Sequence, residues 1–362
     1  AAAVGDITRD IRPFAPDALA EALEPGDVVV SMLPGEFHVP LARLAIAHGA
    51  HFVSSSYISP EMKALDAEAR AAGVALVNEV GLDPGIDHLM AHWLVDDYRN
   101  SAAEHPDNEL SFISYCGGVP KVPNALRYKF SWSPLGVLKA LGTPARAVEG
   151  GSVQEFPRPW EAVSEFVAPL ARPEVFEVYP NRNSVPFIEQ YGFSPEWKIR
   201  RFVRGTLRLK GWKDAWTPIF EEIEESEASP DRDETLGALS ERLWEENAYG
   251  EGEPDRVVLV VSLEAVREGR TVYHKSWVLD AWGDERGSAM ARLVSVPVAL
   301  AVEAVLDGRI GPGVSAAPSD PVLVAEWLDV VAELAQHLEL VDHLESEAAD
   351  EDTPPPGDDI PI

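Results

Sequence analysis

The sequence predicts an α/β fold, in which a parallel sheet is followed by a mixed α+β domain, and three observations carry this prediction. Over residues 18–98, short apolar runs of strand length alternate with helical stretches of roughly 10 residues, the order typical of βαβ units. Three of these runs end in polar, turn-forming residues, at 31–35, 54–57 and 78–85. From about residue 107 the pattern changes to alternating strands and a hairpin. We therefore expect a Rossmann-like parallel sheet, incomplete at its N-terminal side, and a second domain of mixed α+β type.

The first predicted strand covers 28–30. A Pro-Gly-Asp turn precedes it, and its three consecutive valines are typical of a strand that is buried on both faces of a parallel sheet. Helices are expected on either side of it, over 18–23 and 39–47. Its polar end, 31–35, has the sequence Ser-Met-Leu-Pro-Gly.

The second and third predicted strands cover 52–53 and 74–77, and a helix is expected between them over 60–72. The second strand ends in Ser-Ser-Ser-Tyr at 54–57, and the third ends in an acidic turn. Ligands of open parallel sheets bind outside the carboxyl ends of the strands. The three polar strand ends therefore favour a dinucleotide cleft along one edge of the sheet.

The acidic turn at 78–88, Asn-Glu-Val-Gly-Leu-Asp-Pro-Gly-Ile-Asp-His, is the main candidate site. Its two glycines allow backbone angles that are closed to other residues. Because this turn joins a strand to a helix, we interpret Glu79, Asp83 and Asp87 as site residues. The alternative is that the aspartates only cap the helix and stabilise its N-terminal dipole. The sequence leaves both interpretations open.

No G-x-G-x-x-G motif follows a predicted strand. That motif forms the pyrophosphate-binding turn of dinucleotide-binding domains. Either the sheet is of another kind or its first βαβ unit is not included, and the start at Ala1 favours the second explanation. We expect residues 1–84 to form a partial dinucleotide-binding domain, completed by about 288–344.

Residues 85–287 are expected to form the substrate-binding α+β domain, and the acidic, proline-containing tail 345–362 to be disordered. Alternating segments predict strands in the second domain, and two of them read as a hairpin. Two apolar helices follow. The predicted strands are 110–115, 175–179, 201–212, 256–264 and 271–280, and the helices are 289–306 and 322–338.

The charge balance excludes some classes of partner. Sixty-one acidic residues face 30 basic ones, giving a net charge of −31, and such a surface repels nucleic acid and anionic membranes. We expect neither as a partner, and we find no apolar run that reaches the roughly 20 residues of a membrane span. Only 8 of the bases are lysines, which suggests a high-salt cytoplasm where screening relieves the self-repulsion. Full stability in low-salt buffer would contradict that hypothesis.

Seven bases fall within residues 198–213, with no acid among them. Arginine binds carboxylates and phosphates with paired hydrogen bonds, so this run predicts a site for a polyanionic ligand. The alternative is a strand whose polar face forms salt bridges with the surrounding acids, because charge clusters also occur in structural ion-pair networks. The seven bases are Lys198, Arg200, Arg201, Arg204, Arg208, Lys210 and Lys213.

Other reactive side chains give weaker signals. Cys116, the single cysteine, lies between a predicted strand and two glycines with no obvious base nearby, so we interpret it as a small buried hydrophobe. A lone cysteine excludes an internal disulfide and fits a cytoplasmic location. His88 and His92 are four residues apart on one predicted helix, but Leu89 stands where a zinc-binding H-E-x-x-H motif has Glu. We expect no metal site.

Six motifs, in this order, resemble those of the saccharopine reductases, the NADP-dependent, glutamate-forming saccharopine dehydrogenases of the aminoadipate route to lysine. The likeness covers most of the chain and extends to the apolar helix that ends at Leu306-Asp307-Gly308. The motifs are Ser-Ser-Ser-Tyr-Ile-Ser-Pro at 54–60, the acidic turn at 78–88, Ser-Tyr-Cys-Gly-Gly at 114–118, Tyr-Lys-Phe-Ser-Trp-Ser at 128–133, Tyr-Pro-Asn-Arg at 179–182 and Arg-Gly-Thr-Leu-Arg at 204–208.

The resemblance implies a reversible oxidoreductase. Aminoadipate semialdehyde condenses with glutamate, NADPH reduces the imine, and saccharopine leaves. The cofactor would be NADP, with NAD not excluded. The oligomeric state stays open, although a second domain that carries a hairpin often pairs into a homodimer.

The resemblance also implies the site residues. We assign the acid–base work to Asp83 with Tyr57, because a group near the bridging nitrogen must accept a proton before hydride leaves. Saccharopine would be surrounded by Ser56, Tyr57, Asp83, Cys116, Arg182, Thr206, Leu207 and Arg208. The nicotinamide half of the cofactor would lie along Ser31, Met32, Leu33, Pro34, Leu82, Asp83 and Pro84.

Two other functions stay open. A polyamine-forming reductase such as carboxynorspermidine dehydrogenase shares the imine reduction but needs fewer carboxylate-binding arginines, so the basic run argues against it. A non-catalytic chain that only binds substrate is favoured by the missing glycine motif. The presence of Tyr57, Asp83, Cys116 and Arg182 argues against that chain.

Overall fold

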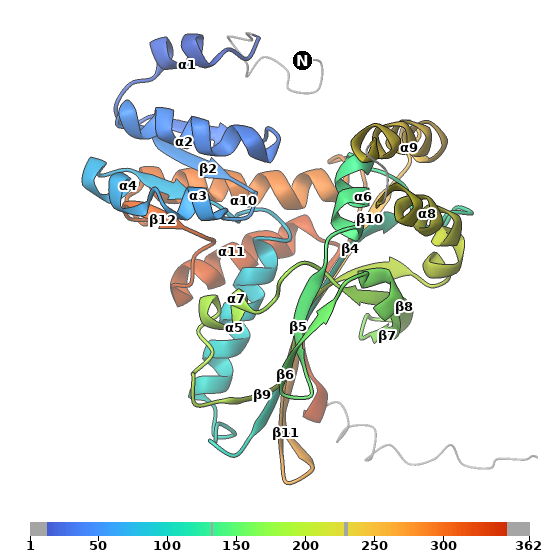
Figure 1. Cartoon of the computed structure of the whole chain (residues 1–362). Coiled ribbons are helices and arrows are strands. Elements are labelled where there is room, and N and C mark those ends of the chain that lie inside the picture. Colours follow the sequence, from blue (N-terminus) through green and yellow to red (C-terminus); the bar gives the residue numbers. More distant parts are fainter. Residues whose placement is uncertain (1–12, 132, 228–230, 346–362) are drawn as a thin grey trace, which may run out of the picture. The chain divides into compact units, whose positions relative to one another are not determined.

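The computed structural model describes residues 13–131, 133–227 and 231–345 (Figure 1). The chain divides into two compact units. We call residues 1–85 with 296–317 the N-terminal unit, and residues 86–295 with 318–362 the large unit. The tail expected to be disordered lies outside the described residues, apart from Glu345.

The C-terminal part of the chain divides differently from the prediction. Only 296–317 joins the N-terminal unit, whereas the sequence led us to expect 288–344. The difference arises because strand β13 (His337–Asp342) pairs antiparallel with strand β11 (Arg270–Trp282) of the large unit.

A four-stranded parallel sheet, in the order β1-β2-β3-β12, forms the centre of the N-terminal unit. The predicted parallel α/β arrangement is therefore confirmed. The strands are β1 (Val28–Ser31), β2 (His51–Ser54), β3 (Ala75–Val77) and β12 (Gly313–Ser315). Helix α1 (Pro16–Ala22) precedes β1, and η2 (Gly35–Phe37), α2 (His38–Ala47), α3 (Pro60–Lys63) and α4 (Asp66–Ala72) lie between β1 and β3 in the chain.

The helix predicted over 60–72 is two helices. The Ser59 hydroxyl caps α3 by accepting from the backbone N–H of Met62. Asp66, the first residue of α4, accepts from the backbone N–H of Val314 at 2.8 Å. Asp66 thereby holds the start of α4 against β12, and Gly73 ends that helix in the left-handed conformation that glycine adopts readily.

A nine-stranded mixed sheet forms the large unit. Strands β4 and β9 run parallel at its centre, and the other pairs are antiparallel. The predicted hairpin is the pair β10 and β11. The remaining strands are β4 (Glu109–Pro120), β5 (Ala145–Glu149), β6 (Ser152–Phe156), β7 (Ser164–Ala168), β8 (Glu174–Pro180), β9 (Lys198–Leu209) and β10 (Asp255–Arg267).

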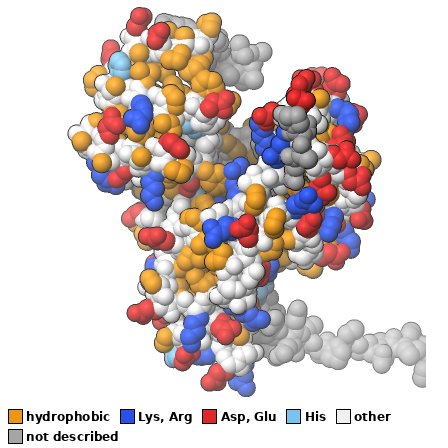
Figure 2. All heavy atoms as spheres, in the orientation of Figure 1, with side chains coloured by type: hydrophobic (Ala, Val, Ile, Leu, Met, Phe, Trp, Pro, Cys, Tyr) orange, Lys and Arg blue, Asp and Glu red, His pale blue; other side chains and the backbone are white. Residues whose placement is uncertain are grey.

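Helices complete the large unit, and α5 packs against α11. An aromatic cluster that includes Tyr128, Trp212 and Trp216 holds α6, α8 and α9 together. Figure 2 shows acidic side chains gathered over the region of α8 and α9, consistent with the run of Asp and Glu in both sequences. The helices of this unit are α5 (Ile86–Asn100), α6 (Pro134–Leu141), η3 (Pro159–Ala162), α7 (Pro186–Gln190), α8 (Trp212–Glu227), α9 (Arg232–Asn247) and α11 (Pro321–Leu334). Helix α10 (Ala289–Leu306) begins in the large unit, but from residue 296 onward it belongs to the N-terminal unit.

Two predicted elements end earlier than expected. The helix expected over 322–338 stops at Leu334, because Gln336 makes hydrogen bonds to the backbone N–H and C=O of Trp282 and leads the chain into β13. The strand expected to reach residue 212 stops at Leu209, and Trp212 begins α8.

Helix α10 is, by length and composition alone, apolar enough to cross a membrane. Of its apolar window, 44% is buried in the structure, and the core helices of soluble proteins pass the same test. This observation is weak and does not by itself indicate a membrane protein.

Candidate active site

The loops that follow β2 and β3 bring Tyr57 and Asp83 together. The Tyr57 hydroxyl donates a hydrogen bond to Oδ1 of Asp83 at 3.0 Å, although the two residues are 26 positions apart. The two strands are parallel neighbours, so their carboxyl ends reach the same edge of the sheet. Both side chains are partly exposed, which leaves the pair accessible at that edge.

Glu79 supports these loops. Its carboxylate accepts from the backbone N–H of Ile58 at 2.9 Å, and its own backbone N–H donates to the carbonyl of Ser56 at 3.0 Å. The residue is 3% exposed and has a positive φ of 56°. The Glu79 carboxylate therefore ties the two loops together, and its interpretation as a site residue stays a prediction.

The turn around Asp83 is built by a close backbone approach. A Cβ atom on Gly85 would lie 2.1 Å from the carbonyl oxygen of Gly81, so no other residue fits there. The backbone N–H of Gly81 also donates to the carbonyl of Pro84 at 2.9 Å. The turn is compact, and it fixes where the backbone presents Asp83.

The predicted cofactor residues occupy the ends of β1 and β3. Ser31 is 2% exposed, and within the described part of the chain its hydroxyl has no hydrogen-bond partner. His38 donates to the carbonyl of Leu33 at 2.7 Å and holds the loop that leaves β1, while Met32 is 55% exposed. Leu82 and Pro84 are buried beside Asp83. An unsatisfied hydroxyl beside an exposed side chain, at a strand end, fits a ligand with polar and apolar parts.

In the large unit, Cys116 and Thr206 are paired across the neighbouring strands β4 and β9. Side chains on a strand alternate between its two faces, so Arg204, Thr206 and Arg208 share one face of β9. Leu207 points to the other face and is fully buried in the apolar core there. The expectation that Leu207 lies around saccharopine therefore stays a prediction, one that concerns its backbone and not its buried side chain.

Arg208 is a buried cation among aromatic rings. Its guanidinium carbon lies 4.7 Å from the ring centre of Tyr128, 5.8 Å from that of Tyr179 and 5.6 Å from that of Trp212. The residue is 7% exposed, and its hydrogen bond is to the carbonyl of Leu207. Among the described residues its Nε has no hydrogen-bond partner and no carboxylate forms an ion pair with it.

Four of the other six bases of the 198–213 run are paired with acids, as the alternative interpretation of this run predicts. Arg204 differs from the rest because its pair is buried, with side-chain exposures of 5% for Arg204 and 0% for Asp87. The ion pairs are Lys198–Asp107 at 3.0 Å, Arg201–Glu149 at 3.0 Å, Arg204–Asp87 at 2.6 Å and Lys210–Glu165 at 3.0 Å.

Arg182 lies in the loop between β8 and α7, with an exposed side chain and a positive φ of 56°. Its carbonyl accepts from the backbone N–H of Arg146 on β5 at 2.8 Å. The loop is thus fixed to the sheet by its backbone.

Asp87 belongs to a buried polar cluster that sequence reasoning missed. Its Oδ2 accepts from Arg204 at 2.6 Å and from the Tyr191 hydroxyl at 3.3 Å, and Nδ1 of His88 lies 2.8 Å from that hydroxyl. Asp87 and Arg204 are 117 positions apart, so no local pattern joins them. The sequence signals were the density of bases around Arg204 and the position of Asp87 in the acidic turn.

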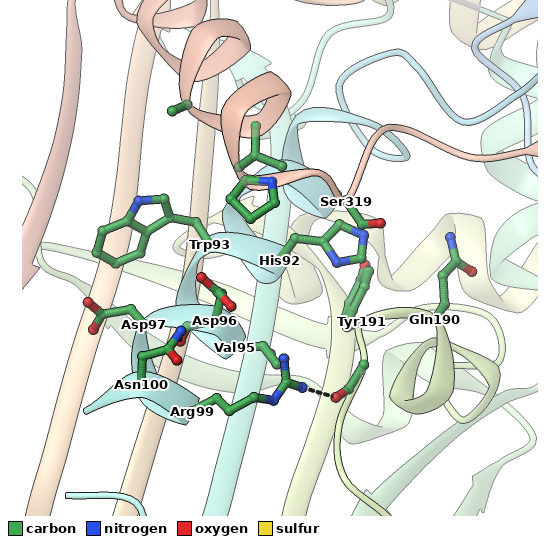
Figure 3. A pocket seen from close by; sticks show the side chains of 14 residues that line it. His92, Trp93, Val95, Asp96, Asp97, Arg99, Asn100, Gln190, Tyr191 and Ser319 are labelled. Atoms are coloured by element: carbon green, nitrogen blue, oxygen red, sulfur yellow. Dashed lines mark hydrogen bonds between the residues drawn. The ribbon is translucent and has the colours of Figure 1, made fainter. Parts of the chain in front are cut away.

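A cavity of about 640 Å³ is lined by residues that include the predicted Ser31, Met32 and Leu33. Another groove, of about 480 Å³, lies beside the Asp87 cluster and runs between α5, residues 190–192 and the start of α11. Figure 3 shows His92 and Tyr191 close together on one side of it. Burial and the neighbouring His88 lower the pKa of His92 to about 4. None of the predicted site residues lines this groove, and the described residues contain no group of three metal-ligating side chains.

Comparison with known proteins gives consistent results. A family model described as the saccharopine dehydrogenase C-terminal domain matches residues 81–335, and one described as the saccharopine dehydrogenase NADP binding domain matches residues 7–77. The chain is 30% identical to a Schizosaccharomyces pombe protein named saccharopine dehydrogenase [NADP(+), L-glutamate-forming], over 89% of this chain and 85% of that protein.

Solved structures show the same likeness. The apo saccharopine dehydrogenase (L-Glu forming) from Saccharomyces cerevisiae is 29% identical, with a TM-score of 0.71 over 90% of this chain and 86% of that one. The homospermidine synthase from Legionella pneumophila has a TM-score of 0.59 over 92% of this chain and 80% of that one. At 10% identity, this second likeness shows only a shared fold.

Proposed function

The chain belongs to the saccharopine dehydrogenase family, and from this premise we propose that it interconverts saccharopine with aminoadipate semialdehyde and L-glutamate, using NADP. The observation that carries the proposal is the hydrogen bond from Tyr57 to Asp83 at the ends of two parallel strands. This hydrogen bond orients a carboxylate at the carboxyl ends of the parallel strands, where dinucleotide-binding sheets bind their ligands.

Asp83 is the general base of the proposed oxidation. It accepts the proton of the bridging secondary amine as hydride leaves the adjacent carbon, and the substrate becomes an imine. Water then adds across the C=N bond and gives a carbinolamine. Protonated Asp83 donates its proton to the nitrogen and accepts the proton of the carbinol hydroxyl as the C–N bond breaks, which gives the semialdehyde and glutamate; Asp83 then releases its proton to solvent. The hydrogen bond from Tyr57 holds the Asp83 carboxyl group in one orientation during these proton transfers.

Arg208 is the proposed carboxylate ligand. A buried guanidinium without an anionic partner is costly, and a bound carboxylate compensates it with paired, charge-assisted hydrogen bonds. Saccharopine carries three carboxylates, which suits Arg208 together with the exposed Arg182. Thr206, on the same face of β9, contributes a hydroxyl, and Cys116 shapes the wall beside it.

NADP, when bound, supplies the hydride acceptor. The residues that would hold its nicotinamide half are Ser31 to Pro34 and Leu82 to Pro84, and the unsatisfied Ser31 hydroxyl supports that assignment. The match of an NADP binding domain model to residues 7–77 favours NADP over NAD. The cytoplasmic location and the homodimer remain predictions.

The test is reduction of NADP⁺ by this protein with saccharopine in high-salt buffer, with NAD⁺ measured in parallel. We expect turnover with NADP⁺ and a lower kcat/KM with NAD⁺. No turnover with either dinucleotide, together with no calorimetric binding of saccharopine, would contradict the proposal. Turnover of a carboxylated polyamine in place of saccharopine would support the polyamine reductase instead.

A further inference from the structure

Arg204 makes contacts in three directions. Its guanidinium donates to Asp87 on α5 at 2.6 Å and lies 4.0 Å from the ring centre of Phe187 on α7. Its backbone N–H donates to the hydroxyl of Ser184 at 2.9 Å, and its carbonyl accepts from the backbone N–H of Asn181 at 2.9 Å. Strand β9 is therefore held at this one residue by a helix on one side and by the 181–184 loop on the other.

Both segments held in this way carry predicted carboxylate ligands. Arg182 lies in the 181–184 loop, and Thr206 and Arg208 follow Arg204 by two and four residues on the same face of β9. A shift of β9 along its own axis at Arg204 would move the side chains of Thr206 and Arg208 together. The same shift would alter the backbone hydrogen bonds that place Arg182.

The buried pair is better suited to fixing a geometry than to adding stability. A buried ion pair often contributes no more to stability than well-packed apolar residues of the same volume, because both charges lose their hydration. It does specify one arrangement, since a planar guanidinium requires its acceptor in a defined direction. Tyr191 completes that arrangement by donating to the same oxygen of Asp87 at 3.3 Å.

We propose that Arg204 and Asp87 are positioning residues that hold β9 and the 181–184 loop in the register at which Arg182, Thr206 and Arg208 meet the carboxylates of the substrate. This inference rests on the proposed function. We assign Arg204 a positioning role, although it shares a strand face with Arg208, because its guanidinium forms a buried ion pair with Asp87.

The test separates binding of saccharopine from binding of NADP⁺. In Arg204→Lys, which keeps the charge but not the planar fork, we expect the KM for saccharopine to rise at least about tenfold. We expect kcat and the KM for NADP⁺ to change less than about threefold. Asp87→Asn, which keeps the volume of the partner, should give the same pattern and serves if Arg204→Lys does not fold.

Arg201→Lys is the matched control. Arg201 is on the same strand and pairs with Glu149 at 3.0 Å, but its side chain is 38% exposed. We expect its KM for saccharopine to equal that of the wild type. If folded Arg204→Lys and Asp87→Asn both keep the wild-type KM for saccharopine, the inference is overturned while the proposed function stands. If the wild type itself does not oxidise saccharopine, the proposed function fails and the inference fails with it.

Discussion

The proposed site residues of the N-terminal unit and those of the large unit are presented by differently constructed elements. In the N-terminal unit, Tyr57 and Asp83 come from turns at the ends of short strands, and Glu79 holds those turns together. In the large unit, Arg204 and Arg208 come from the interior of one long strand, where alternation alone puts both on the same face. Two arginines on the same face of one strand can therefore have different roles. Arg204 has a buried carboxylate partner and Arg208 is surrounded by rings, so we assign positioning to the first and binding to the second.

The largest effect on catalysis should come from Asp83 and Tyr57, the residues on turns of the N-terminal unit. Asp83→Asn removes the proposed base, and general base catalysis typically contributes about 10²–10⁴-fold, so kcat should fall by that order while the KM for saccharopine changes little. Tyr57→Phe should lower kcat about tenfold, since it removes the hydrogen bond from Tyr57 to Asp83. Steady-state kinetics with saccharopine and NADP⁺ measures both. A near-normal rate for Asp83→Asn would refute the assignment.

The two arginines of β9 should differ in how much their loss lowers the free energy of unfolding. Arg204→Met leaves the carboxylate of Asp87 buried without its cation, which should lower the free energy of unfolding by about 3–5 kcal/mol. Arg208→Met removes a buried cation that has no carboxylate partner among the described residues, so stability should change by less than about 1 kcal/mol. Urea unfolding in high salt compares the two variants. Equal losses would erase the distinction that we draw between them.

A smaller effect should follow from His92, beside the Asp87 cluster. Its pKa is about 4 in the folded protein, below the 6.5 of an ordinary histidine, so the unfolded chain binds more protons between these pH values. The stability that this residue contributes is fully present above pH 6.5 and is lost as pH falls toward 4, up to about 3 kcal/mol.

Measuring unfolding free energy from pH 7 to pH 4 tests the role of His92. His92→Gln should flatten the decline, whereas the control His337→Gln, at an exposed position of the same unit, should follow the wild type. An unchanged slope in His92→Gln would show that other groups cause the loss.

The smallest effect should come from an exposed base of the same run. Lys210 pairs with Glu165 at 3.0 Å, with side-chain exposures of 61% and 63%. Exposed pairs contribute about 0–1 kcal/mol. Lys210→Met should therefore change the free energy of unfolding by no more than about 1 kcal/mol, and it should leave the KM for saccharopine close to that of the wild type. A marked rise of KM would mean that the whole basic run, and not Arg208 alone, attracts the substrate.

The part of the site that local patterns encode was predictable. Strand and helix periods place the ends of β2 and β3 at one sheet edge, so the proximity of Tyr57 and Asp83 followed from the order of elements. Resemblance to a known family then supplied the chemistry. Both the parallel sheet and the hairpin of β10 and β11 were visible in the same way.

What the sequence could not provide depends on pairing between distant segments. The Asp87–Arg204 pair joins residues 117 positions apart. The orientation of Leu207 depends on which face of β9 meets the apolar core, and β13 was hidden because its pairing with β11 overrides a helical pattern. In each case tertiary packing selects between local alternatives that the sequence alone allows.

The most direct test of the account is calorimetric titration of saccharopine into three proteins: the wild type, Asp83→Asn and Arg208→Met. We expect Asp83→Asn to bind saccharopine within about threefold of the wild-type Kd, because the Asp83 carboxylate acts in proton transfer. We expect Arg208→Met to bind at least about tenfold more weakly, because it loses a charge-assisted hydrogen bond. Wild-type affinity in Arg208→Met would contradict the claim that this buried arginine binds the substrate carboxylate.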